Sequence, residues 1–371
     1  MPDLRDYLYW RGDLSLAQAK WNEADAMVLA RLSYAPFDPI AKQIADQPMK
    51  ISDAALALLR TPDIEKNVIM KEDLDLLREL STSARYGDML LNHYVNRVDE
   101  ETQTQFSAVT IHMDDTLDYV SFRGTDNTLV GWKENFNMSF LFPVPAQKSA
   151  VAYLNTVAMA FDRRMIVGGH SKGGNLAMYA AAYCAEETQS RIERVYNFDG
   201  PGFDGKIIST SEYQRICGKM VTYIPQSSIV GLLLEHEEQY IIVESLQKTG
   251  YLQHDIYTWA VEREHLKTLD HVTHASRFLD LTLKGWIADM DVDQREQFIN
   301  ALYSIISQTK ARTLQEMDDK WFECAVAILS SLSNVDEKTW KLITQCLSLF
   351  MNNVKRSVSQ LDEIWRGNPN G

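Results

Sequence analysis

A serine in a glycine-rich turn has the clearest chemical potential in this sequence. Ser171 lies within Gly169-His170-Ser171-Lys172-Gly173-Gly174, after the apolar run Met165 to Gly168 and before an alanine-rich stretch. Such an order predicts a strand, a sharp turn and a helix. The turn strains and exposes the serine, the glycines relieve crowding, and the start of the helix offers N–H groups to an oxyanion. We therefore expect Ser171 to be a nucleophile, the alternative being a turn that only connects two elements.

A second motif lies upstream of the serine. It is the run Phe122-Arg123-Gly124-Thr125-Asp126, followed by Gly131-Trp132-Lys133-Glu134-Asn135-Phe136. This segment resembles class-three lipases, in which a strand ends in Phe-Arg-Gly-Ser/Thr and a tryptophan-containing helix follows. The resemblance implies that Thr125 supplies one donor of an oxyanion hole. The second donor is then the backbone N–H of Lys172, while Arg123 and Asp126 brace the loop.

A longer signature narrows the resemblance. It runs from Gln105-Phe106-Ser107-Ala108 through the Phe-Arg-Gly-Thr-Asp motif to Gly-Gly-His-Ser-Lys-Gly-Gly-Asn-Leu-Ala. Together these motifs resemble an uncharacterised bacterial family of lipase-like hydrolases, a domain of unknown function. The resemblance extends from about Leu29 to Glu262, and it implies an α/β-hydrolase fold that acts on an ester bond.

A serine nucleophile needs a general base. In this fold the triad runs serine, acid, histidine along the chain, which removes the histidines that precede Ser171. His170 adjoins the serine, so its ring is expected to point away from it. We expect His254 to be the base, because Leu252 to Trp259 resembles the lipase segment in which the catalytic histidine precedes a short aromatic stretch. A surface-loop histidine is the alternative, and His236 is the second candidate.

The acid departs from the lipase pattern. Class-three lipases carry it in an Asp-Ile-Val-Pro-like motif, and the matching run here is Ser227-Ser228-Ile229-Val230-Gly231. Ser228 stands where the lipases have aspartate. A serine accepts a hydrogen bond from imidazole, but it has no charge to stabilise the imidazolium. The acid must therefore come from another position.

Asp199 is the expected replacement. It ends the apolar run Val195 to Phe198 and precedes Gly200-Pro201-Gly202, so it lies at the carboxyl edge of the sheet, where catalytic groups gather in open α/β folds. The alternative role is that of a turn-former. Asp204 and Glu238 are the other candidates for the acid.

Lys172 admits two interpretations of its side chain. Beside the nucleophile it can hold a substrate anion, or it can be a solvated side chain at the start of a helix. We favour the solvated position.

Strands and helices alternate around these residues. Helices are expected between Trp21 and His93, including Asn22 to Leu32 and the region Asp73 to Leu91. A β-hairpin and then alternating elements follow, which implies parallel pairing. The expected hairpin strands are 105–111 and 118–122, later strands 165–168, 195–198, 220–224, 240–243 and 257–261, and helices 146–161, 173–185 and 210–216.

The expected architecture is therefore an α/β-hydrolase with a mostly parallel sheet flanked by helices. Three segments are expected along the chain: N-terminal helices over 1–100, the core over 101–285 and a C-terminal helical appendage over 286–371. The last segment has amphipathic stretches around Phe298 to Ile306 and Trp340 to Phe350.

Composition excludes some partners. The chain has 371 residues and a formal net charge of −14, which repels nucleic-acid phosphates. No run of about 18 apolar residues predicts a membrane span, and the N-terminus lacks a secretory pattern, so a cytoplasmic location is expected. The four cysteines form no CxxC pair and are expected to be buried and apolar. No cofactor or metal is implied.

Two functions remain open from the sequence. The first is a serine acyl hydrolase that acts on a small-molecule or lipid ester. The second is a catalytically weak or inactive binding or scaffold protein that kept the fold, suggested by Ser228 and the added helices.

Overall fold

The computed structural model describes residues 1–371 apart from 100, 103, 127–130, 132, 135–136, 139–140, 249, 251, 308–334 and 368–371. The chain forms two compact units that interleave along the sequence. The first comprises Met1–Val98, Gln105–Gly124 and Pro145–Val272, and the second comprises Asp99–Thr104, Thr125–Val144 and Thr273–Gly371. The three expected segments stay a prediction.

A nine-stranded sheet forms the centre of the described chain, in the order β1-β2-β3-β4-β5-β6-β7-β8-β11. Strands β4 to β8 pair in parallel, and β3 pairs antiparallel with β4, which confirms the expected hairpin and the expected parallel core. The strands of this sheet are β1 (Met49–Lys50), β2 (Leu90–Asp99), β3 (Thr104–His112), β4 (Leu117–Phe122), β5 (Arg164–His170), β6 (Ile192–Phe198), β7 (Met220–Pro225), β8 (Gln239–Val243) and β11 (Thr268–Leu269). A separate two-stranded sheet pairs β9 (Val261–Glu262) with β10 (His265–Leu266).

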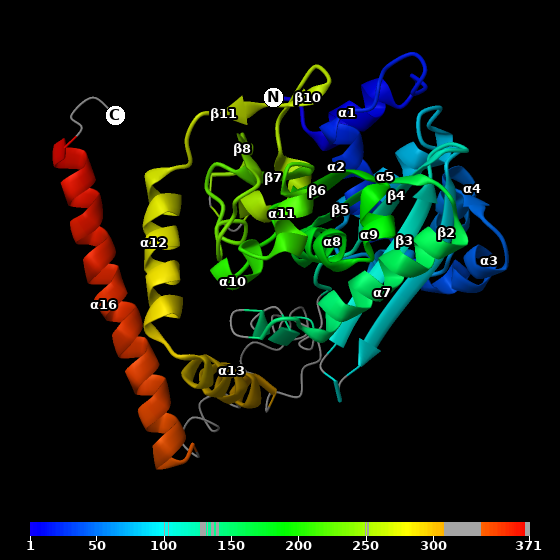
Figure 1. Ribbon diagram of the computed structural model, residues 1–371. Coiled ribbons are helices and arrows are strands. Elements are labelled where there is room, and N and C mark those ends of the chain that lie inside the picture. The colour runs from blue at the N-terminus through cyan, green and yellow to red at the C-terminus, as the bar shows by residue number, and fades with distance from the viewer. Residues whose placement is uncertain are drawn as a thin grey trace. The chain divides into compact units, whose positions relative to one another are not determined.

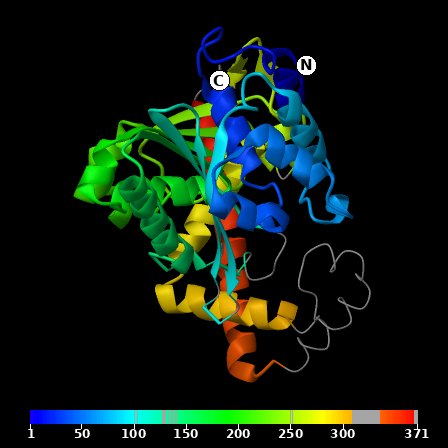
Figure 2. The same ribbon diagram turned by 90° about the vertical axis from the view of Figure 1, so that its right-hand side faces the viewer.

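Helices cover both faces of this sheet in the first unit (Figures 1 and 2). On one face α8 contacts β4, β5 and β6 and packs against α7 and α11, whereas α2 covers the same strands from the other face. The helices of this unit are α1 (Leu4–Arg11), α2 (Glu23–Leu32), α3 (Ala41–Asp46), α4 (Ile51–Leu59), α5 (Glu72–Thr82), α7 (Pro145–Ala160), α8 (Lys172–Tyr183), α9 (Glu186–Ser190), α10 (Gly205–Ile208) and α11 (Ser211–Cys217), with 3₁₀ turns η1 (Asp38–Ile40), η2 (Ile64–Lys66), η3 (Leu252–His254) and η4 (Ile256–Thr258). This is the α/β-hydrolase architecture.

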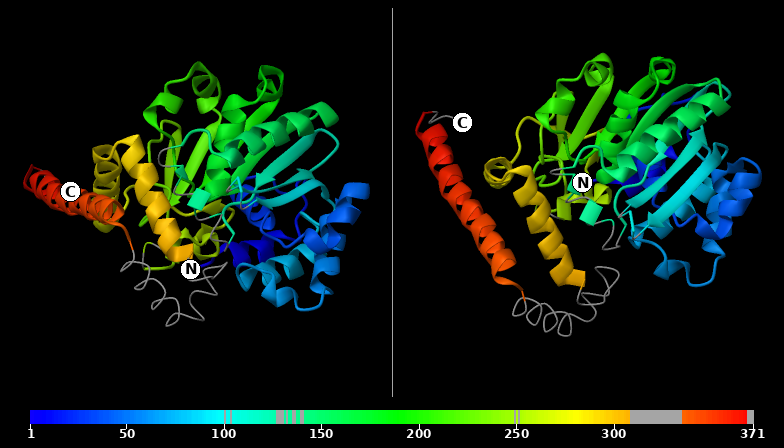
Figure 3. Two further views of the ribbon diagram at one scale, coloured as in Figure 1. Left: turned by 90° about the horizontal axis from the view of Figure 1, so that it is seen from below. Right: turned by 60° about the horizontal axis from the view of Figure 1, so that its bottom comes forward.

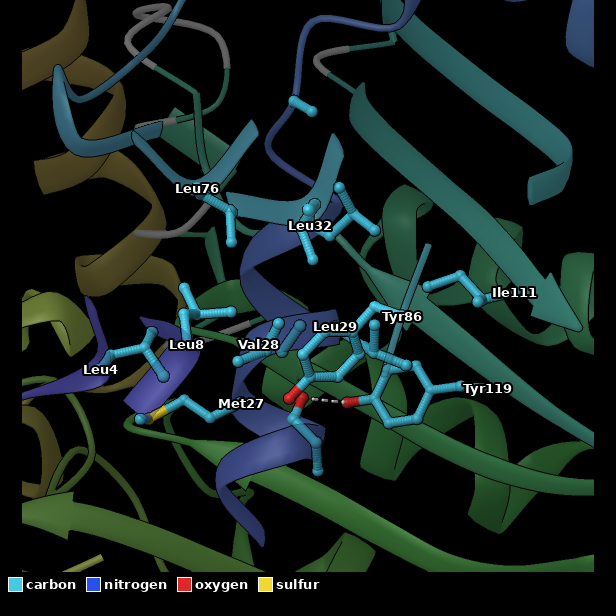
Figure 4. Close-up of a cluster of buried hydrophobic side chains, with 14 of the residues drawn as sticks. Leu4, Leu8, Met27, Val28, Leu29, Leu32, Leu76, Tyr86, Ile111 and Tyr119 are labelled. Atoms are coloured by element: carbon cyan, nitrogen blue, oxygen red, sulfur yellow. Dashed lines mark hydrogen bonds between the residues drawn. The ribbon is translucent and has the colours of Figure 1, made fainter. Parts of the chain in front are cut away.

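Helix α2 shows how the sequence builds this packing. Asn22 caps the helix by accepting from the N–H groups of Ala24 and Asp25, and the Asp25 carboxylate accepts from the N–H of Asn22. Such a reciprocal pair satisfies N–H groups that the helix leaves free. The apolar side chains that follow belong to a buried cluster that also contains Leu4, Leu76 and Ile111, and Tyr119 of β4 donates to the carbonyl of Ala26 (Figure 4).

The helices of the second unit pack on one another. They are α12 (His274–Asp289), α13 (Val292–Ser307) and α16 (Glu337–Gly367). Helix α16 runs beside α12 (Figures 1 and 3), and Trp286 of α12 packs its ring against Phe298 and Phe350 and donates to the carbonyl of Cys346. None of the helices in the described residues is long and apolar enough to span a membrane.

Two elements differ from the expectation. Helices joined by turns were expected in the region Asp73 to Leu91, but after α5 ends at Thr82 the chain forms turns instead of a further helix, and Leu90 opens β2, which pairs with β1. The late strand over 257–261 is wrong too, since 256–258 form a 3₁₀ turn in which the Asp255 side chain accepts from the N–H of Tyr257. Short polar caps compete with strand pairing here.

Candidate active site

The turn after β5 places Ser171 at the carboxyl edge of the sheet. Its φ of 59° and ψ of −132° lie in a region that side chains rarely adopt. The Ser171 N–H donates to the carbonyl of Phe198 at 2.8 Å, which ties the turn to the end of β6. The hydroxyl does not cap α8 and is half-buried. The geometry is that of the strained nucleophile turn.

Gly173 allows the close approach on which this turn depends. A Cβ there would lie 2.1 Å from the carbonyl oxygen of Phe122 and 2.9 Å from the N of Gly124. Helix α8 therefore starts against the backbone at the end of β4, with no room for a side chain.

Gly173→Ala is expected to lower the free energy of unfolding by about 1–3 kcal/mol, because overpacked sites force the backbone to shift. Chemical denaturation measures the free energy of unfolding of this variant and of a control variant, Gly218→Ala. A Cβ at Gly218 meets nothing within 4 Å, so that substitution is expected to change stability by less than about 1 kcal/mol. Equal effects of the two variants would show that the approach is not tight.

The structure brings Asp199 and His254 together. Asp199 Oδ2 lies 2.6 Å from His254 Nδ1, and the carboxylate is almost fully buried whereas the imidazole is 22% exposed. The Asp199 backbone has a φ of 51°, and its N–H donates to the carbonyl of Tyr223, so the residue leaves β6 in a fixed direction. An Nδ1–H···carboxylate bond leaves His254 Nε2 as the basic nitrogen.

Ser228 supports this carboxylate. Its hydroxyl lies 2.5 Å from Asp199 Oδ1, which also accepts from the N–H of Gly231 at 3.1 Å. The buried carboxylate thus has three donors: the Ser228 hydroxyl, the Gly231 amide and the His254 imidazole. Such a set holds a buried charge in place. Ser228, at the position of the lipase acid, therefore contacts the carboxylate that is expected to replace that acid.

The alternative acids and the second histidine have other partners. Asp204 caps α10 by accepting from the N–H of Lys206. Glu238 lies 2.7 Å from His236 Nδ1 and accepts from Tyr213 and Thr222. His236 and Glu238 thus form a separate buried pair.

The acid Glu238 is expected to make stability depend on pH. Burial alone raises its pKa, but the hydrogen bonds and charge of His236, with Thr222 and Tyr213, lower it to about 2 from 4.5. A folded pKa below the unfolded one stabilises the protein above pH 4.5, and this contribution, about 3 kcal/mol, disappears as pH falls from 4.5 to 2. Unfolding free energies of Glu238→Gln and wild type should therefore converge over that range.

The neighbouring exposed Glu237 offers the control. Glu237→Gln is expected to leave the same profile close to wild type. A stability difference between Glu238→Gln and wild type that stays constant from pH 6 to pH 2 would contradict the assignment.

The Lys172 side chain differs from the expectation. It is buried at 1% exposure, and its Nζ donates to the carbonyl and the side-chain oxygen of Gln105 at 2.7 and 2.6 Å. The solvated position was wrong because the side chain turns under α8 to β3, where carbonyl oxygens solvate the ammonium in place of water. Its backbone N–H still stands at the start of α8.

The oxyanion segment begins beside the serine. A Cβ on Gly124 would lie 3.2 Å from Ser171 Cβ, and the N–H of Gly124 donates to the Tyr34 hydroxyl. Thr125 follows directly in the chain and belongs to the second unit, so its oxyanion role stays a prediction. Arg123 donates to Asn96. Trp132, Asn135 and Phe136 of the expected motif, like Cys324, lie outside the described residues.

The sequence did not identify Tyr34 as part of the site, and it predicted no contact partner for His170. His170 Nδ1 lies 3.1 Å from the Tyr34 hydroxyl, and its ring contacts that of His254 in a tilted arrangement with centroids 4.6 Å apart. Tyr34 is 136 residues away, and no local pattern marks it. The only signal is a tyrosine that follows an apolar helix.

Within the described residues, no group of three or more His, Cys, Asp or Glu side chains is placed to hold a metal ion. Of the cysteines there, Cys184 and Cys346 are buried, whereas Cys217 is only partly buried.

A comparison with models of protein families shows to which family the chain belongs. A model described as Mbeg1-like matches residues 80–304, more than half of the sequence. The chain belongs to the Mbeg1-like family. The match covers the β3–β4 hairpin, the serine turn, Asp199 and His254. No curated protein matches this Mbeg1-like chain in sequence.

Solved structures similar to this Mbeg1-like chain include three proteins from fungi. The Rhizomucor miehei lipase propeptide complex is 14% identical over 52% of the chain and 66% of the lipase, just under two thirds, with a TM-score of 0.35. A mutant form of MDLA from Penicillium cyclopium is 14% identical over 66% and 83%, with a TM-score of 0.39. Lipase II from Rhizopus niveus is 16% identical over 60% and 82%, with a TM-score of 0.35. At these values the likeness carries no argument about activity.

Proposed function

We propose that this Mbeg1-like protein is a serine acyl hydrolase that cleaves an ester through Ser171, His254 and Asp199. The observation that carries the proposal is the Asp199–His254 hydrogen bond at 2.6 Å beside the strained serine turn. A buried acid, a partly exposed imidazole and a serine on a sharp turn are the groups that acyl transfer requires.

The three side chains share one edge of the sheet. The N–H of Ser171 donates to the carbonyl of Phe198, the residue before Asp199. The ring of His170, the residue before Ser171, contacts the ring of His254. These contacts support a position of the Ser171 hydroxyl near the His254 imidazole. For the reaction, His254 Nε2 must reach Ser171 Oγ, a contact that often tightens only with substrate bound.

The chemistry then follows from the groups in place. His254 removes the proton of Ser171 as the oxygen attacks the acyl carbon, and Asp199 stabilises the imidazolium that results. The backbone N–H of Lys172, at the start of α8, stabilises the oxyanion, and the role of Thr125 as a second donor stays a prediction. His254 returns its proton to the leaving alkoxide, the acyl-enzyme forms, and water attacks it by the reverse sequence. Acid and alcohol are the products.

The alternative of an inactive binding or scaffold protein was suggested by Ser228 at the lipase acid position. The contacts of Ser228 with Asp199 weaken that suggestion, because a carboxylate is present and fully hydrogen-bonded where the imidazole needs it. The substrate remains a small-molecule or lipid ester.

Hydrolysis of a p-nitrophenyl ester series from acetate to palmitate tests the proposal. The intact chain is expected to hydrolyse at least one chain length with a kcat/KM that rises to an optimum, since an acyl pocket selects by apolar contact. Failure to hydrolyse any ester in the series, at any pH from 6 to 9, would favour the inactive alternative.

A further inference from the structure

His170 lies at a junction between the nucleophile turn, the loop of the base and the oxyanion segment. Its side chain is buried, and Nε2 lies 2.8 Å from the backbone carbonyl oxygen of His254. Nδ1 lies 3.1 Å from the hydroxyl of Tyr34, which also receives the N–H of Gly124 at 3.1 Å. The two imidazole planes are inclined by 36°.

These contacts select one tautomer of His170. A carbonyl oxygen only accepts, so the hydrogen must be on Nε2. In the neutral ring Nδ1 then accepts. The one hydrogen of the Tyr34 hydroxyl is within reach of two acceptors on His170, Nδ1 and the backbone carbonyl oxygen, each 3.1 Å away. The hydrogen bonds form a relay that runs in one direction. The N–H of Gly124 donates to Tyr34, the Tyr34 hydroxyl donates to His170, and the Nε2–H of His170 donates to the carbonyl of His254.

The surroundings keep this ring neutral. Burial lowers the pKa of His170 well below its usual value, and the nearby charges of His254 and Arg31 lower it further. Tyr34 does not offset them with a charge, because burial raises its own pKa to about 12. A neutral ring beside His254 adds no second positive charge when the base takes up its proton.

Tyr34 is itself held by a buried network. The guanidinium of Arg31 lies 4.4 Å from the centroid of its ring and pairs with Asp73 at 2.6 and 2.7 Å. Asp73 also accepts from the hydroxyl of Tyr257, three residues after His254. The N-terminal helices therefore hold the loop of the base directly through the Tyr257 hydroxyl, and they reach the His254 carbonyl only through Tyr34 and His170.

We propose that His170 and Tyr34 are positioning residues that fix the His254 imidazole against the Ser171 turn and hold Gly124 at the start of the oxyanion segment. Neither residue touches the substrate. The inference rests on the proposed function of Ser171 and His254, and it assigns the N-terminal helices a part in alignment of the base. Small displacements of a base raise the barrier more than they weaken substrate binding.

A matched pair of substitutions at His170 tests the role. The amide of glutamine reaches the position of Nε2 and can still donate to the His254 carbonyl, whereas the shorter amide of asparagine reaches only the position of Nδ1. With the best p-nitrophenyl ester, His170→Asn is expected to lower kcat by about 10- to 100-fold with little change in KM, and His170→Gln to recover most of that loss. Tyr34→Phe is expected to lower kcat by about tenfold.

Equal kcat values for folded His170→Asn, His170→Gln and wild-type protein would overturn the proposal, since a structural role alone changes the melting temperature and not the turnover of the folded fraction. A loss confined to KM would overturn it as well.

A second readout needs no activity. Nitrogen-15 NMR of histidine-labelled Ser171→Ala protein is expected to show His170 as the neutral Nε2–H tautomer from about pH 5.5 to 8, and Tyr34→Phe in that background is expected to disturb it. An imidazolium or an Nδ1–H tautomer at His170 would overturn the proposed relay by itself. A wild-type enzyme that is inactive and takes up no serine-directed label would instead refute the proposed function, so the two failures are distinguishable.

Discussion

Asp199→Asn is expected to lower kcat for ester hydrolysis at pH 7 by about 10³- to 10⁴-fold while the protein stays folded. Asparagine keeps the shape of the side chain but has no charge for the imidazolium, and its amide can present a donor to His254 Nδ1, which favours the wrong tautomer. The Ser228 hydroxyl and Gly231 N–H still bind the remaining carbonyl oxygen, so the turn should survive. Steady-state kinetics and thermal unfolding measure both quantities.

Asp204→Asn is the matched control. Asp204 follows the same turn, but its side chain caps α10, a role that asparagine fills equally well. Activity of this variant is expected to stay within about twofold of wild type. A similar loss in both variants, or none in Asp199→Asn, would remove Asp199 from the acid position.

Ser171→Ala is expected to abolish hydrolysis, with a loss of kcat on the order of 10⁵- to 10⁶-fold. The hydroxyl is the attacking group and does not cap α8, so its removal should leave the fold intact. Alanine must still adopt the strained backbone of the turn, and the folded fraction is checked by circular dichroism and thermal melting.

Ser228→Ala separates the nucleophile from a serine that only supports the acid. Its hydroxyl binds Asp199, which keeps the Gly231 and His254 donors without it. The expected loss of kcat is about 10-fold, from one hydrogen bond to a charged group. Residual turnover of Ser171→Ala near the wild-type value would show that another residue attacks the ester.

The local parts of the site could be predicted from sequence because each is encoded within a few residues. The strand, glycine turn and helix around Ser171 follow one another directly, and the acidic residue that ends β6 must lie at the same sheet edge. The alternation of strands and helices predicted the parallel core for the same reason. The sequence left Asp199, Asp204 and Glu238 as candidate acids, and only the fold shows that Asp199 is the one in contact with His254.

Contacts between distant segments were out of reach. Tyr34 and His170 are far apart in the chain, and nothing near Tyr34 indicates that its hydroxyl contacts the ring and the carbonyl of His170 and the N–H of Gly124. The burial of Lys172 was missed because its side chain runs to β3, whose carbonyl and Gln105 amide replace water. The error at Leu90 arose because apolar spacing in a short stretch fits a helix and a strand alike.

The central claim is that Ser171 is an activated nucleophile. Incubation of the full chain with a fluorophosphonate, followed by peptide mapping by mass spectrometry, tests it most directly. We predict one adduct on Ser171, no adduct in Ser171→Ala, and labelling slowed by at least about 10³-fold in Asp199→Asn. A folded wild-type protein that gains no adduct, or gains it on a different serine, would contradict the account.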